Sequence, residues 1–372
     1  MPLTVAVPKE TAAGERRVAM EPSVAKKLDK LGVKVLIENG AGDEAGFRAE
    51  DFAPAEVVDK AALNDADVVL RVQIPTAEDI DTMKEGTVLI GTLTPFRNPE
   101  LIAKLRDKQI TSFAMELIPR ISRAQSMDVL SSQAAVAGYK AAIMGADLAC
   151  RFFPMLTTAA GTIRPSKVVV IGAGVAGLQA IATAKRLGAM VEGYDVRSAT
   201  KEQVESLGAK FIELSIKAEG EGGYARELTP EEQKQQQEEL ADYIAQADVL
   251  ITTAAVPGRP APKIIPTATV EKMKSGAVII DLAAEGGGNT ELTQPGETIK
   301  HGDVVIHGPL NVPSQVPLHA SEMYAKNLFN FLSPMIADGE LQFDWEDEII
   351  AGALLTRDGE IVNEQVKEAT GG

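Results

Sequence analysis

Cysteine is almost absent from this sequence of 372 residues, and so are the residue spacings that bind metal ions. Cys150 is the one cysteine, so the chain cannot form an intrachain disulfide. The one thiol and three histidines do not have the spacing of a Cys/His metal-binding motif. The sequence therefore predicts neither a disulfide framework nor a metal centre.

Positive charge is also scarce. The chain has 37 Lys and Arg residues against 53 Asp and Glu residues, which gives a formal net charge of −16. Nucleic acids and anionic lipid surfaces repel such a protein, so we expect no nucleic-acid partner. The simplest role of the negative charge is to keep the protein soluble.

A membrane span and a signal peptide are lacking as well. The opening "MPLTVAVPKE" is typical of a strand and lacks the layout of a secretory signal. The longest apolar run, "VVVIGAGVAGLQAIATA", contains glycines that fit a strand, a turn and a helix better than a membrane helix. We expect a cytoplasmic protein without a membrane span of its own.

The N-terminal third of the chain alternates strands with amphipathic helices. Short runs rich in β-branched residues predict strands within 3–8, 34–38, 67–72, 87–93 and 110–117. Helices are predicted at 21–32 and 98–108, and the first has proline near its start and glycine at its end. This alternation favours a mostly parallel sheet.

A long Ala-rich helix, 129–153, is predicted to cross from this region into a second βα series. The second series has predicted strands at 167–172, 189–195, 209–214, 247–254, 277–283 and 303–308. A helix at 319–336 then leads to a hairpin at 354–362 with Asp358-Gly359 at its turn. We expect two Rossmann-like doubly wound parallel-sheet domains, 1–128 with 319–372 and 129–318, joined by long helices with a cleft between them.

The second series contains a dinucleotide-binding fingerprint, Gly172-x-Gly174-x-x-Gly177. It follows an apolar strand, opens an amphipathic helix and precedes Asp195 by 18 residues, which makes it more specific than the glycines alone. Free N–H groups at the helix start would hold the pyrophosphate. The predicted contacts also include Ala173, Val175, Val196 and Arg197. A Rossmann domain that binds no dinucleotide is the alternative.

Asp195 also predicts which dinucleotide is bound. Its carboxylate can accept hydrogen bonds from the adenosine ribose, whereas a 2′-phosphate would be repelled by about 4 kcal/mol at about 4 Å and an effective dielectric of about 20. NAD(H) should therefore be preferred over NADP(H). Arg197 opposes this preference, because an arginine can receive a 2′-phosphate.

Groups that move protons at neutral pH are few. An enzyme that oxidises an alcohol or amine with NAD usually needs a His, Lys or Tyr for this purpose. We expect His301 in a surface turn, His307 at the end of a strand and His319 just before the last long helix. None of them lies in an evident site loop.

The opening "VPKETAAGERRVAMEPSVAKKLDKLG" resembles that of the alanine dehydrogenase and proton-translocating transhydrogenase superfamily. Alanine dehydrogenases of that superfamily carry a lysine, a histidine and an aspartate where this sequence has Gln73, Thr94 and Glu285. The resemblance therefore argues against amino-acid oxidation. Hydride passing directly between two nicotinamide rings needs placement of the rings and exclusion of water, but no acid or base at the reacting carbons.

The segment "RISRAQSMD", residues 120–128, closely resembles the signature segment of domain I, the NAD(H)-binding component of proton-translocating NAD(P)+ transhydrogenase; "TKEQVESLGAKF" and "GGYAREL" add to the match. The resemblance implies that Gln125 orients the nicotinamide ring, that Arg120 and Asp128 hold its carboxamide and each other, and that Ser131 adds a hydrogen bond. The same wall would include Ile121, Ser122, Ser126 and Met127. An exposed polar loop with its own Arg–Asp pairing is the alternative.

Further contacts are implied around a glycine-rich segment, "AEGEGGYAREL". The resemblance implies a mobile loop that bends at Gly220, Gly222 and Gly223, so that Tyr224 can fold over the bound nucleotide as a lid. Gln236 and Ala255 are the remaining implied contacts. Such a segment on its own is more often an ordinary surface loop.

The expected function is the NAD(H)-binding subunit of a transhydrogenase of the Si-specific/Re-specific class. It would pass hydride from NADH to NADP+ held by a partner. The resemblance implies a homodimer that docks on membrane subunits carrying the proton channel and the NADP(H)-binding domain, and is thus peripheral to the cytoplasmic membrane. A stand-alone NAD-dependent alanine dehydrogenase and a non-catalytic NAD sensor are the alternatives.

Overall fold

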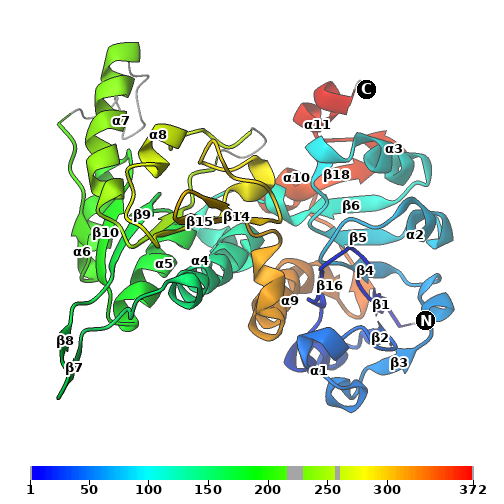
Figure 1. Cartoon of the computed structure of the whole chain (residues 1–372). Helices are drawn as coiled ribbons and strands as arrows, with labels where there is room; N and C mark the ends of the chain where they lie inside the picture. Colours follow the sequence, from blue (N-terminus) through cyan, green and yellow to red (C-terminus); the bar gives the residue numbers. More distant parts are fainter. Residues whose placement is uncertain (1, 216–228, 256–259, 371–372) are drawn as a thin grey trace. The chain divides into compact units, whose positions relative to one another are not determined.

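The computed structural model describes residues 2–215, 229–255 and 260–370. The chain divides into two compact units: the first unit comprises residues 1–133 and 314–372, and the second unit comprises residues 134–313. Within the described ranges, no helix combines the length and the hydropathy needed to cross a lipid bilayer. Each unit is built around its own twisted sheet (Figure 1).

The first unit contains an eight-stranded sheet with the order β19-β18-β6-β5-β4-β1-β2-β3. Its strands are β1 (Thr4–Val7), β2 (Lys34–Glu38), β3 (Glu56–Val58), β4 (Val68–Leu70), β5 (Val88–Gly91), β6 (Thr111–Ala114), β18 (Leu354–Arg357) and β19 (Glu360–Ile361). The strands β1 to β6 are parallel and run in the order 3-2-1-4-5-6 of a doubly wound dinucleotide-binding fold. Strands β18 and β19 add an antiparallel edge.

Both faces of this sheet are buried because its residues alternate between two apolar clusters. The helices of the first unit are α1 (Pro22–Lys30), α2 (Ala77–Thr82), α3 (Pro99–Asp107), α9 (Pro317–Leu332), α10 (Glu348–Ala353) and α11 (Glu364–Thr370). Val5 and Val7 face one cluster with helices α1 and α9, whereas Ala6 faces the other with α2, α3 and α11. The period of two along each strand therefore determines which helices cover which face.

The second unit repeats this architecture with a seven-stranded sheet, β11-β10-β9-β12-β13-β15-β14. Its strands are β9 (Lys167–Ile171), β10 (Met190–Tyr194), β11 (Lys210–Phe211), β12 (Val249–Thr252), β13 (Val278–Asp281), β14 (Thr298–His301) and β15 (Val304–His307). All are parallel except β14. Its helices are α5 (Val175–Arg186), α6 (Lys201–Ser206), α7 (Pro230–Ala245) and α8 (Thr267–Val270), together with most of α4 (Val129–Leu148). Helices α4, α5 and α6 cover one face, and α7 and α8 cover the other.

The expected fold class, two Rossmann-like α/β domains, is confirmed. Local chemistry explains several element ends. Helix α1 begins after Glu21, whose side chain accepts the Ser23 N–H, and stops before Gly32, which has φ of 77°. The predicted hairpin is β18–β19, and Asp358 and Gly359 both take the positive φ that its two-residue turn requires.

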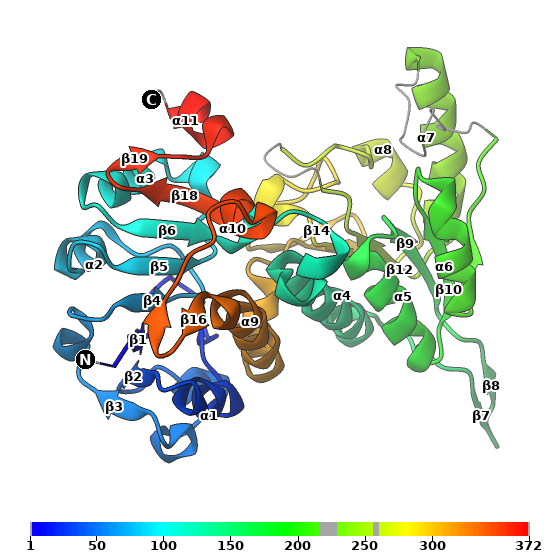
Figure 2. The same cartoon turned by 180° about the vertical axis from the view of Figure 1, so that it is seen from behind.

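A separate hairpin in the second unit was not predicted. Strands β7 (Leu156–Thr158) and β8 (Gly161–Ile163) form a separate two-stranded hairpin that projects away from the seven-stranded sheet (Figure 2). Every residue of both strands is exposed. Since such a ribbon has little stability by itself, its apolar side chains make it a candidate contact surface.

The only tryptophan of the sequence lies in an aromatic stack in the first unit. Its ring stacks on Phe343 with centroids 4.7 Å apart, and the Arg357 guanidinium lies 4.5 Å from the Trp345 ring. Trp345 remains 38% exposed. The stack joins the segment before α10 to the antiparallel edge of the sheet.

Candidate functional site

The glycine fingerprint forms the turn between β9 and α5 in the second unit. Gly172 has φ of 93°, a value that side chains disfavour. A Cβ on Gly177 would collide with the carbonyl oxygen of Gly172, so only glycine lets helix and strand pack this closely. A Cβ on Gly174 would meet nothing within 4 Å, which leaves open space at the start of α5. The turn therefore has the shape needed for a pyrophosphate at a helix N-terminus.

Asp195 follows β10 and is bound to this turn. Its Oδ2 accepts the Ala173 N–H at 2.7 Å, and its carboxylate forms an ion pair with Arg197. Burial by itself would raise the pKa of Asp195, but hydrogen bonds from Arg197 and Ala173 lower it. The carboxylate is therefore ionised and held beside the fingerprint, while Val196 next to it is 44% exposed.

The loop after β12 is connected to the same turn. The Thr253 hydroxyl donates to the Gly172 carbonyl at 3.1 Å. The side chain of Asn289 holds Ala254 by accepting its N–H and donating to its carbonyl. Asp281, fully buried, accepts the Asn289 N–H at 2.7 Å. Sequence reasoning missed Asp281 and Asn289, although both lie in "DLAAEGGGN", which begins at the last residue of the buried strand β13.

The remaining residues predicted around the nucleotide are less constrained. Ala255 is exposed beside Ala254, and Gln236 is partly exposed on α7. Gly220, Gly222, Gly223 and Tyr224 lie outside the described residues. The fingerprint, Asp195 and the β12 loop are therefore the described portion of the site in the second unit.

The predicted nicotinamide segment lies in the first unit, mostly in the 3₁₀ helix η6 (Ser122–Met127). The Ser126 carbonyl accepts hydrogen bonds from Asn327 at 2.9 Å and Asn330 at 3.0 Å, both on α9. Ile121 and Met127 pack against the apolar core. The segment is thus anchored through its backbone and apolar side chains, while Arg120, Ser122, Gln125 and Ser126 remain exposed.

The expected contact between Arg120 and Asp128 is absent from the described region of the chain. Asp128 instead caps α4: it accepts the Ser131 N–H at 2.8 Å and the Ser131 hydroxyl at 2.6 Å. Because the N–H groups in the first turn of a helix have no acceptor within the helix, Asp128 turns toward Ser131. Arg123, one of the arginines of the segment, pairs with Asp347 at 2.6 Å.

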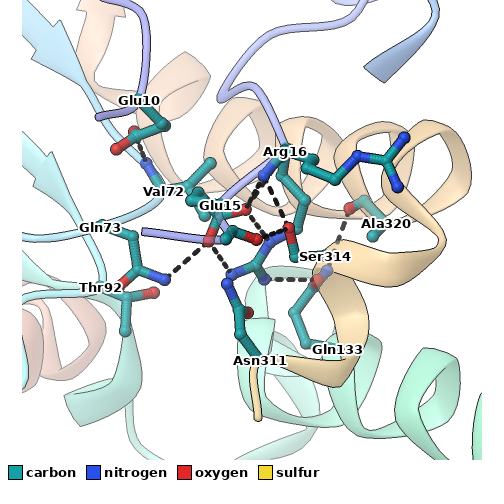
Figure 3. Close-up of polar contacts among 12 residues, drawn as sticks. Glu10, Glu15, Arg16, Val72, Gln73, Thr92, Gln133, Asn311, Ser314 and Ala320 are labelled. Carbon is teal, nitrogen blue, oxygen red and sulfur yellow. Dashed lines mark hydrogen bonds and ion pairs between the residues drawn. The ribbon is translucent and has the colours of Figure 1, made fainter. Parts of the chain in front are cut away.

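A buried polar cluster in the first unit was not predicted (Figure 3). Glu15 and Arg17 form an ion pair at 2.7 Å with side chains only 0% and 7% exposed. Gln73 donates to Glu15 at 2.7 Å, and Arg17 donates to Gln133 at 2.8 Å. Burial alone would raise the pKa of Glu15, but Arg17 overcomes this effect and lowers it to about 2. The opposite charges of "GERR" directly before a buried run were the available sequence signal.

Thr94 lies in a second, partly buried polar arrangement. Its φ of 41° is rare for a β-branched residue. The Glu116 carboxylate accepts the N–H groups of Leu93 and Thr94, and Asn98 donates to the Thr94 hydroxyl at 2.6 Å. Burial raises the pKa of Glu116. Thr94 is therefore held by structural hydrogen bonds.

His301, His307 and Glu285 each lie within hydrogen-bonding distance of a neighbouring residue. His301 ends strand β14 instead of lying in the turn, and its ring is 3.3 Å from Glu271. Burial lowers the pKa of His307, which is 2.7 Å from the Thr298 hydroxyl. His319 lies inside α9, because Pro317 starts that helix earlier than predicted. Glu285 is exposed and accepts the Asn311 N–H at 2.7 Å.

Comparison with known proteins relates both units of the chain to the same family. Residues 6–137 match the family described as alanine dehydrogenase/PNT, N-terminal domain, and residues 141–364 match alanine dehydrogenase/PNT, C-terminal domain. A relative in Rhodospirillum rubrum, named as the first part of NAD(P) transhydrogenase subunit alpha, is 51% identical over 377 residues. The match covers 97% of this chain and 98% of that protein.

Solved structures resemble the chain over nearly its whole length. The structure of transhydrogenase from Sinorhizobium meliloti is 42% identical with a TM-score of 0.87, covering 97% of this chain and 99% of that one. A structure of L-alanine dehydrogenase is 26% identical with a TM-score of 0.82, covering 99% of both chains. The fold is therefore shared with both enzymes, and the sequence is closer to the transhydrogenase.

Proposed function

The chain belongs to the alanine dehydrogenase/PNT family, and from this premise we propose that it is the NAD(H)-binding subunit of a proton-translocating NAD(P)+ transhydrogenase. The 51% identity to a component of transhydrogenase subunit alpha, along almost the entire chain, supports this role. The proposed reaction is direct hydride transfer from NADH to NADP+ on a partner subunit, in the Si-specific/Re-specific class.

The main observation in support of this proposal is that the fingerprint turn fits a dinucleotide. The space at Gly174 can admit a pyrophosphate, and the ionised Asp195 beside Ala173 is the acceptor that ribose hydroxyls would reach in place of the Arg197 side chain. Bound NADH would supply the hydride, and its transfer gives NAD+ and NADPH without releasing a proton. The protein would orient the ring through Gln125, with Arg120 and the Asp128–Ser131 pair as further polar groups beside it.

The chain's own residues also bear on the alternative reaction. Alanine oxidation needs a proton acceptor near neutral pKa. Gln73 and Thr94 have side chains that do not titrate in this range, and both are used in partly buried hydrogen bonds. Glu285 is exposed and bound to Asn311. These contacts favour placement of two rings over acid–base catalysis.

The proposed partners follow from the proposed reaction. The acceptor NADP(H) would be carried by a separate domain, and the coupling to protons would lie in membrane subunits on which this chain docks. We also propose a homodimer, for which the exposed β7–β8 hairpin offers an apolar surface.

One experiment separates the candidate functions. The purified chain is mixed with NADH and with a transhydrogenase NADP(H)-binding domain loaded with NADP+, and NADPH formation is followed. We expect transfer only with the partner domain and no turnover of alanine with NAD+. Alanine-dependent turnover by the chain alone would contradict the proposal, and NADH binding without transfer to any partner domain would point to an NAD sensor.

A further inference from the structure

The carboxylate of Asp195 has its hydrogen-bonding capacity fully used. A carboxylate offers about four lone-pair directions. Oδ1 accepts the Arg197 N–H at 2.9 Å and the Arg197 Nε at 2.9 Å. Oδ2 accepts the Ala173 N–H at 2.7 Å and the Arg197 Nη2 at 2.9 Å. No direction is left for a further donor.

The four donors differ in how easily they can leave. Two are the backbone N–H groups of Ala173 and Arg197, which are fixed by the fold. The other two belong to the Arg197 side chain, which is 49% exposed, whereas the Asp195 side chain is 6% exposed. Only the guanidinium can withdraw without moving the backbone.

The two donors of the guanidinium occupy one direction on each carboxylate oxygen. A vicinal diol, such as the 2′- and 3′-hydroxyls of a ribose, also presents two neighbouring donors. Both pairs of donors therefore compete for the same two acceptor directions.

We propose that Arg197 is a specificity-determining residue: the ribose diol of NAD(H) displaces its guanidinium from Asp195, whereas the 2′-phosphate of NADP(H), which lacks that diol, draws the same guanidinium to itself. The inference rests on NAD(H) binding as in the proposed function. Binding of NADH is then an exchange of donors on a carboxylate that stays ionised. Arg197 offsets part of the repulsion between the Asp195 carboxylate and the 2′-phosphate of NADP(H). It therefore reduces the preference for NAD(H) over NADP(H) that Asp195 creates.

The test is the Arg197→Met variant, which keeps the length of the side chain and removes its donors. Dissociation constants for NADH are measured by titration and those for NADPH by competition with NADH. Because the Arg197 side chain of this pair is half exposed, displacing it costs little, and we expect NADH to bind up to about fivefold more tightly to the variant. NADPH should bind about tenfold more weakly, as for the loss of one charge-assisted hydrogen bond.

Two variants complete the experiment. Arg197→Lys keeps the charge without the two-pronged geometry, so its NADH affinity should lie between those of the wild type and Arg197→Met. Arg186→Met, at the exposed end of α5, is the matched control and should change neither constant. The inference would be overturned if Arg197→Met bound NADH more weakly, or if the ratio of its NADPH and NADH dissociation constants did not rise above the wild-type ratio. Either result would leave the proposed function intact. If the wild-type chain did not bind NADH at all, both would fail.

Discussion

Two carboxylates, Asp195 and Glu15, are kept ionised in buried surroundings by an arginine two residues further along the chain. The same spacing serves different purposes. Asp195 lies beside the fingerprint turn and has a partner that can leave, whereas Arg17 is itself buried and holds Glu15 permanently. The exposure of the arginine therefore separates a candidate binding group from a structural ion pair.

The Glu15 pair predicts a pH dependence of stability. The pKa of Glu15 falls from 4.5 to about 2 on folding, so the pair stabilises the fold above pH 4.5 and this contribution is lost as the pH drops toward 2. The shift corresponds to about 3 kcal/mol. Glu15→Gln should lower the free energy of unfolding at pH 7 by about this amount, as measured by urea denaturation.

The pH series provides the check on this prediction. The difference between wild type and Glu15→Gln should shrink steadily between pH 4.5 and 2. Glu50→Gln, which breaks a pair whose side chains are 79% and 70% exposed, should have little effect at any pH. A difference that stays constant with pH would mean that the destabilisation has another cause.

Gln125 allows a kinetic prediction. Its side chain is exposed on η6 and would orient the ring without holding the rest of the dinucleotide. Gln125→Asn should slow single-turnover hydride transfer by about 10- to 100-fold, since small misplacements of reacting groups are costly. The NADH dissociation constant should change little. The control is Gln203→Asn on the exposed face of α6, and equal losses of affinity and rate would reduce Gln125 to a binding contact.

Among the elements, the turn from β9 to α5 shows how glycines with different tasks can be distinguished. Gly174→Ala adds a methyl group into open space, so folding should be unaffected while NADH binding weakens because the pyrophosphate is kept away. Gly177→Ala forces helix and strand apart, so both the melting temperature and NADH binding should fall. Thermal unfolding and NADH titration of both variants test this distinction, and each variant is the control for the other. A lower melting temperature for Gly174→Ala would contradict it.

The strength of local patterns determined how much of the fold could be predicted. Buried parallel strands such as β2 and β9 were found within a residue or so, since continuous β-branched runs are distinctive. Strand β3 and the β7–β8 hairpin were missed, because three-residue exposed strands have no apolar periodicity. Helix α9 starts two residues earlier than predicted, at Pro317, although proline is a regular first-turn residue.

Some parts of the candidate site could also be predicted from the sequence, and others could not. Glycine spacing and the distance to Asp195 are encoded locally, so the fingerprint could be recognised. The Asp128–Ser131 cap was missed although the spacing is that of a helix N-cap. The Gln73–Glu15 and Asn289–Ala254 hydrogen bonds join residues far apart in sequence, and no short-range pattern predicts such pairs.

For the molecule as a whole, the β7–β8 hairpin leads to a prediction about assembly. Leu156 and Ile163 are paired across its strands and are 38% and 46% exposed. If the hairpin forms the proposed homodimer contact, the double variant Leu156→Ser, Ile163→Ser should sediment as a monomer. Thr157→Ala, Thr162→Ala, on the neighbouring pair, should leave the dimer largely intact. Identical sedimentation of the wild type and the serine variant would exclude this surface.

The position of Trp345 makes the two units optically distinguishable. Since the sequence has one indole and it lies in the first unit, intrinsic emission excited at the red edge comes from that unit alone. Its face-to-face neighbour Phe343 and the guanidinium of Arg357 give this emission an environment that disappears when the stack opens. Melting of the first unit can thus be recorded without labels.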